Sequence, residues 1–155
     1  MLIMHDMVGS AFALARPIVE GMYRGLWINV CATDAEIERF MNKDEIKPTI
    51  AELATAIDES YRAEGFFLNL KKRSWDALNS YTHTGMLQLG RRFTKHEVKP
   101  SYTDGQIFEI TTALTTSVLL LISRFFAKQN YVETSRKVDA LIESYGSGET
   151  TTRRG

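Results

Sequence analysis

The chain has 155 residues, of which 44% are hydrophobic and 25% are charged, and its 19 basic side chains balance 19 acidic ones. This length suits one domain with a single core, and this composition excludes disordered and fibrous proteins. The zero net charge excludes a field of the whole molecule that would attract nucleic acid. Because Cys31 is the only cysteine, no intramolecular disulfide can form, and we expect a reducing, cytoplasmic location.

Targeting and membrane segments are not expected. The first residues lack a basic leader followed by an uninterrupted apolar run, so we expect no secretory signal. The longest apolar segment, residues 115–127, contains Arg124 and falls short of the ~20 residues that a helix needs to cross a bilayer. This segment predicts a buried helix and no membrane contact.

The first half of the chain predicts three helices. Apolar residues recur at helical spacing over residues 6–32, and Pro17 predicts a kink or a restart within this segment. Thr33 and Glu36 have the spacing of a capping box, which predicts that a short helix begins there. Pro48 suits the first turn of the next helix, because a first-turn amide has no intrahelical acceptor to lose.

The second half predicts three more helical segments. Helical spacing continues over residues 67–83, and Asp104 is a suitable cap for a long helix over 105–128. That long helix is apolar on most sides and is therefore predicted to be the central one. A last amphipathic helix precedes a polar tail. We expect an all-α, single-domain bundle of five to six helices over residues 1–145 and a disordered tail over 146–155.

One basic segment surrounds a histidine. Between Lys71 and Lys99 the chain has seven basic and two acidic side chains, a local charge of 7 − 2 = +5. His83 lies in this segment, on the same side of the predicted helix as Trp75 and Asn79. It either neutralises the negative end of the helix dipole or acts as a proton shuttle beside a phosphate-bearing ligand.

A second group of charges lies on the first long helix. Arg16, Glu20 and Arg24 follow one another at four-residue steps and therefore share one face. They form either a solvated ladder of ion pairs or, if a neighbouring helix covers them, a polar cleft in which Glu20 orients Arg24 or His83. No spacing of histidines and carboxylates suggests a metal site.

Three segments carry a family resemblance: "ARPIVEGMYRGLW", "CATDAEIERF" and "NSYTHTGMLQLGRR". They resemble an uncharacterised bacterial family of small helical proteins, which in turn resembles the HEPN superfamily (higher eukaryotes and prokaryotes nucleotide-binding). The resemblance implies a helical bundle of a bacterial defence or toxin–antitoxin system that cleaves RNA without metal, at a site shared by two protomers. Asn79 and His83 match the HEPN motif, whereas Leu78 stands where that motif has its arginine.

The resemblance implies that His83 is the general acid or base, and Asn79 would orient the substrate or the imidazole. Because Leu78 replaces the arginine of the motif, the phosphate-binding cation would come from elsewhere in the chain, from Arg91, Arg92 or Arg24. Further candidates for binding or orienting the substrate are Glu20, Arg24 and Arg16. No cofactor is expected. The expected partners are a second copy of the chain, RNA or a nucleotide, and a protein from the same operon.

Two other functions remain open. The chain could be a non-catalytic module that binds a nucleotide, RNA or protein, which the leucine at position 78 favours. It could also be a purely structural dimerisation domain, with the segment "RPIVEGMYRGLW" as its interface.

Overall fold

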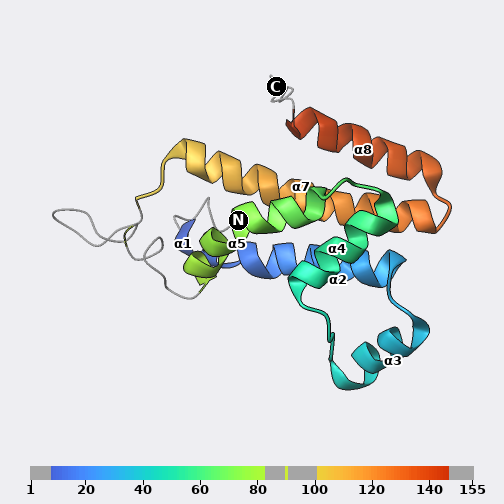
Figure 1. The fold of residues 1–155 in the computed structure, drawn as a ribbon. Helices are drawn as coiled ribbons and strands as arrows, with labels where there is room; N and C mark the ends of the chain where they lie inside the picture. Colours follow the sequence, from blue (N-terminus) through green and yellow to red (C-terminus); the bar gives the residue numbers. More distant parts are fainter. Residues whose placement is uncertain (1–7, 83–89, 91–100, 147–155) are drawn as a thin grey trace.

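The structure is a computed structural model that describes residues 8–82, 90 and 101–146. Its described helices are α1 (Val8–Ala13), α2 (Ala15–Val30), α3 (Asp34–Lys43), α4 (Ile50–Tyr61), α5 (Phe66–Thr82), α7 (Asp104–Lys128) and α8 (Val132–Gly146). The described residues contain no strand, which confirms the predicted all-α bundle (Figure 1).

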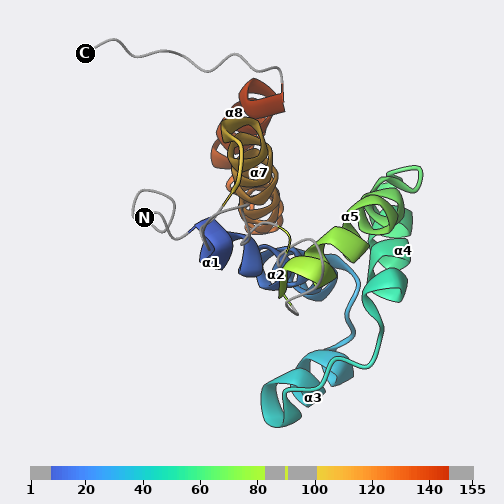
Figure 2. The same ribbon diagram turned by 90° about the vertical axis from the view of Figure 1, so that its left-hand side faces the viewer.

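α2 is the central helix, since it packs against α1, α4, α5 and α7. Figure 2 shows α4 and α5 on one side of α2 and α7 with α8 on another, while α3 lies apart. In the described part of the chain, the buried hydrophobic side chains all come from α1, α2, α4 and α5: Val8, Phe12, Ala15, Val19, Met22, Tyr23, Leu26, Trp27, Leu53, Ala54, Ile57, Phe67 and Leu78. The core is therefore built around α2.

Helix starts follow local sequence signals. The helix is interrupted at Leu14, between α1 and α2. Pro17 therefore lies in the first turn of α2, in agreement with the predicted restart. The capping box of Thr33 and Glu36 is confirmed at α3. Pro48, however, precedes α4 and does not lie within it, because Thr49 forms the cap.

α7 is also capped by a threonine, one residue before the predicted cap. Thr103, and not Asp104, is its N-cap, and the Thr103 side chain accepts a hydrogen bond from the amide of Gln106. The Gln106 side chain accepts one from the Thr103 amide in return, so both orphan amides are satisfied.

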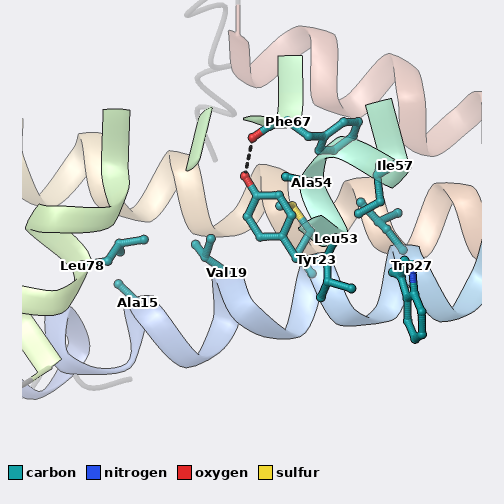
Figure 3. Packing of buried hydrophobic residues seen from close by; sticks show 11 residues of the cluster. Ala15, Val19, Tyr23, Trp27, Leu53, Ala54, Ile57, Phe67 and Leu78 are labelled. Atoms are coloured by element: carbon teal, nitrogen blue, oxygen red, sulfur yellow. Dashed lines mark hydrogen bonds between the residues drawn. The ribbon is translucent and has the colours of Figure 1, made fainter. Parts of the chain in front are cut away.

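Two buried hydrogen-bonding side chains connect α2, α4 and α5. Asp58 near the end of α4 accepts hydrogen bonds from the amides of Phe67 and Leu68, both at 2.9 Å, and so caps the start of α5. The Tyr23 hydroxyl on α2 donates to the Phe67 carbonyl at 2.8 Å (Figure 3). These bonds fix the register of α5 against the other two helices.

α7 and α8 are held together differently. The prediction that the long apolar helix is the central one is wrong: its only buried side chains are Ser117 and Ser123. Ser123 lies 3.1 Å from the Ser135 hydroxyl of α8 and donates to Asp139 at 2.6 Å, and Arg124 pairs with the same carboxylate at 2.5 Å. The fully buried residues of the contact between α7 and α8 are therefore small and polar.

A glycine sets the distance between α2 and α7. A Cβ atom at Gly25 would lie 2.8 Å from Cδ1 of Leu121, closer than side chains tolerate. The absent side chain lets Leu121 pack directly on the α2 backbone. α7 thus contacts the core along one face only.

Candidate functional site

Leu78, which the predicted HEPN resemblance places where that motif has an arginine, points into the core. Its side chain is 4% exposed and lies near Ala15 and Val19 of α2 (Figure 3). A cation at this position would be buried among apolar groups, where its desolvation is costly. The position therefore provides packing and no charge for a phosphate.

Asn79, the next residue, is half-buried. Its Oδ1 atom is buried and has no hydrogen-bond partner in the described part of the chain. Buried side-chain oxygens nearly always have a partner, so this atom has unused capacity to accept a hydrogen bond. Asn79 is the one predicted catalytic residue that the structure describes.

His83, Arg91 and Arg92 lie outside the described residues, so the geometry of the predicted catalytic group stays a prediction. The point at which the chain leaves α5 is nevertheless defined. Thr82 ends α5, and its hydroxyl lies 3.0 Å from the Leu78 carbonyl of its own helix and 3.4 Å from the Ala13 carbonyl. The end of α5 therefore lies beside the junction of α1 and α2.

The predicted ladder of ion pairs on α2 is present. Glu20 pairs with Arg16 at 2.9 Å and with Arg24 at 3.6 Å. Arg16 also lies over the ring of Trp75 on α5, with 5.3 Å from its guanidinium carbon to the ring centroid, and Lys71 lies 5.5 Å from the same centroid. A neighbouring helix thus covers one end of the ladder, where a cation over an indole is attracted by the ring.

Arg16 and Arg24 differ in their distance from the end of α5. α2 and α5 run in opposite directions, because Tyr23 meets Phe67 at one end and Ala13 meets Thr82 at the other. Arg24 lies eight residues beyond Arg16, about 12 Å further along the helix axis. Arg16 is therefore better placed than Arg24 to act beside the end of α5.

An open cavity of about 500 Å³ lies around Cys31 at the end of α2, and Glu36 and Glu52 contribute to its walls. Burial raises the pKa of the Cys31 thiol, and so does nearby Glu59, whereas a hydrogen bond with Ser60 lowers it. The thiol stays protonated at neutral pH and is a poor nucleophile. Both glutamates accept hydrogen bonds in capping boxes, which occupies their carboxylates.

A cavity of about 420 Å³ lies where α2, α4 and α7 all end, with Arg124 and Lys128 in its walls. Lys128 donates to the Asn29 carbonyl, and Arg124 pairs with Asp139. Three helix C-termini present their negative dipole ends here, so the two cations offset that charge. This environment does not favour an anionic ligand.

An apolar cavity of about 250 Å³ lies over α2, between α5 and α7. Three residues with a hydroxyl group line it, Ser74, Thr116 and Ser117, and both serines are satisfied within their own helices. Ser74 donates to the Leu70 carbonyl and Ser117 to the Ala113 carbonyl, each at 2.8 Å. This cavity offers apolar contact and no group that would identify a particular ligand.

The most prominent surface feature is a row of exposed side chains on α7, which we call the α7 stripe. Its apolar members are Phe108, Val118, Ile122 and Phe125, which are 56%, 44%, 38% and 53% exposed. The stripe also contains Thr111, which is exposed, and Thr115, which is half-buried. The α7 helix is long and apolar enough to span a membrane by length and composition alone.

The spacing of the stripe is that of a coiled-coil seam. Its six members follow one another at alternating steps of three and four residues, so they repeat every seven residues and occupy one face. The heptad spacing is present in the printed sequence, but the apolar composition of the helix predicted a buried, central helix and no exposed seam. The alternative interface on the segment "RPIVEGMYRGLW" stays a prediction, although Met22, Leu26 and Trp27 of this segment are buried in the chain's own core.

The comparisons with known proteins place the chain in a family but assign no activity. No curated protein and no solved structure matches it. One family model matches residues 1–145, and its description is a family of unknown function, DUF6988. The description of this family does not mention HEPN proteins, so the HEPN resemblance stays a prediction. The chain belongs to the DUF6988 family.

Proposed function

We propose that this protein is a non-catalytic helical module that binds a protein chain through the α7 stripe. One observation carries the proposal: four large apolar side chains of α7 are 38% to 56% exposed in a row with heptad spacing. Contiguous apolar surface of this kind on a soluble domain marks an interaction site. A heptad seam selects another helix as its partner, because knobs on one helix fill holes on the other.

The position of Leu78 supports the absence of catalysis. In the HEPN motif the corresponding arginine stabilises charge on the phosphate, whereas Leu78 is 4% exposed and packs in the core. A leucine cannot replace a bidentate, charge-assisted contact.

The proposal is tested by placing two charges on the stripe, in the double variant Val118→Glu, Ile122→Glu. Because both residues face away from the core, we expect the free energy of unfolding in dilute solution to change by less than about 0.5 kcal/mol for each substitution. Fluorescence of a dye that binds apolar surface should fall severalfold. Ala140→Glu, at an exposed position of α8, is the matched control and should leave dye binding unchanged.

A large loss of stability would contradict the proposal. If the double variant unfolds about 3 kcal/mol more easily, the stripe is packed within the chain and is not an interaction surface.

Metal-independent RNA cleavage is the second candidate function. The observation that favours it is Asn79, whose buried Oδ1 atom has no described partner and which lies four residues before His83. An assay with total RNA and a chelator, with the wild-type protein and His83→Ala side by side, separates the two functions. The non-catalytic module predicts no cleavage by either protein, whereas cleavage by the wild type that His83→Ala abolishes would replace our proposal with the nuclease.

A further inference from the structure

We infer that the partner of the α7 stripe is the α7 stripe of a second copy of this chain, paired antiparallel about a twofold axis. The inference rests on the proposed function, since it names the occupant of the same surface. It is carried by the order of the residue types along the stripe.

Antiparallel pairing matches each residue of the stripe with another residue of the stripe. If the twofold axis passes between Thr116 and Ser117, Phe108 faces Phe125 of the second copy, Thr111 faces Ile122, and Thr115 faces Val118. A twofold interface of this kind is closed, because the same patch serves on both protomers. The two bulky phenylalanine pairs then lie at the ends, and the β-branched residues lie between them.

The threonines favour the antiparallel direction. In a parallel pair, Thr111 and Thr115 would each face their own copies, which gives two polar layers in the seam. In the antiparallel pair every threonine faces an isoleucine or a valine, against which its methyl group can pack. The Thr111 hydroxyl already donates to the Ile107 carbonyl at 2.7 Å, so it needs no partner across the interface.

A membrane is a poorer occupant of the stripe than a helix. A helix embedded in lipid is apolar all around, whereas α7 exposes Glu109 one residue after Phe108. The face of α7 toward α8 also contains Ser123 and Arg124, which bind Asp139. One stripe about 26 Å long, from Phe108 to Phe125, fits the seam of a helix pair.

Disulfide cross-linking tests both the partner and the direction. In a Cys31→Ser background, Thr111→Cys and Ile122→Cys are made as separate proteins, mixed and oxidised. Antiparallel pairing brings the two positions together between copies, so the mixture should give a cross-linked dimer and each protein alone should give at least tenfold less. Parallel pairing would place each cysteine against its own copy and reverse this result.

Two controls keep the outcome decisive. Adding Val118→Glu to both proteins should remove the cross-link, and adding Ala140→Glu should not. If thiol titration shows that the cysteines are reactive but neither the mixture nor either protein alone forms a cross-linked dimer, a second copy of the chain does not occupy the α7 stripe. In that case, if the Val118→Glu, Ile122→Glu variant is as stable as the wild type, the proposed interaction surface is retained but its partner is another protein. Binding of the wild-type chain to phosphatidylcholine vesicles would instead assign the stripe to a membrane.

Discussion

The two sides of α2 differ in how they are packed. Toward α4 and α5, the interface consists of large apolar side chains such as Leu26, Leu53 and Ile57, each 0% exposed. Toward α7 and α8, the fully buried residues are three serines. Leu114, Leu120 and Leu121 of α7 are only partly buried against the core, and the apolar side chains of the α7 stripe face outward. The first side is a conventional core that stabilises the fold, whereas the second presents apolar surface to a partner. An apolar helix can thus contribute to the core or to an interface with a partner, and the exposed fraction of its side chains distinguishes the two cases.

The largest expected effect comes from the core. Leu53→Ala should lower the free energy of unfolding by about 3 kcal/mol, because it leaves a cavity in a fully buried site. Val118→Ala removes a smaller side chain that is 44% exposed, and in dilute solution it should cost less than about 0.5 kcal/mol. Urea unfolding of both variants measures the difference. Equal losses would show that the two sides of α2 are packed alike.

The bond between α4 and α5 gives the next largest effect. Asp58→Ala leaves the amides of Phe67 and Leu68 without their acceptor, and we expect a loss of about 2 kcal/mol. Asp139→Ala, which removes the acceptor between α7 and α8, is the matched change on the other side. Hydrogen exchange should show α5 losing protection in the first variant and only α8 in the second. If both variants lost protection throughout the chain, the two sides of α2 would not be independent, which would contradict this comparison.

A pH dependence follows from Tyr23. Burial raises the pKa of the Tyr23 hydroxyl well above its ordinary value, and the charge of Asp58 raises it further. The folded state therefore holds this proton more tightly than the unfolded state, so stability is complete below a pH of about 10 and falls as pH rises beyond it. Tyr23→Phe should cost about 1 kcal/mol at neutral pH through the lost bond to Phe67, and it should reduce the alkaline loss. A steeper alkaline loss in the variant would argue against this assignment.

The smallest expected effects concern two matched capping boxes. Thr49 caps α4, which contributes to the core, and Thr33 caps α3, which has no buried residue. Thr49→Ala should lower global stability by about 1 kcal/mol, whereas Thr33→Ala should only fray α3. Thermal unfolding together with hydrogen exchange distinguishes the two outcomes. A global loss from Thr33→Ala would show that α3 packs on the core more firmly than its exposure indicates.

Much of the fold was predictable because it depends on neighbours in sequence. The capping box at Thr33 and the restart near Pro17 are local features, and the structure has both. The all-α class followed from helical periodicity without strand-like alternation. Those signals depend on residues within a turn or two of each other.

The candidate site was less predictable because it depends on which helix covers which face. The apolar composition of α7 indicated a buried helix, but composition does not show how many neighbours a helix has. The Arg16, Glu20 and Arg24 ladder was predicted from spacing, whereas its contact with Trp75 required the antiparallel arrangement of α2 and α5. The heptad steps of the α7 stripe were readable in the sequence, but only exposure distinguishes an open seam from a covered one.

Sedimentation equilibrium of the full chain over a wide range of concentrations tests the central claim most directly. We predict a mass that rises from one chain to two with concentration for the wild type, and a mass of one chain throughout for Val118→Glu. A wild-type protein that remains a single chain at every concentration, or a dimer that Val118→Glu leaves intact, would contradict the account.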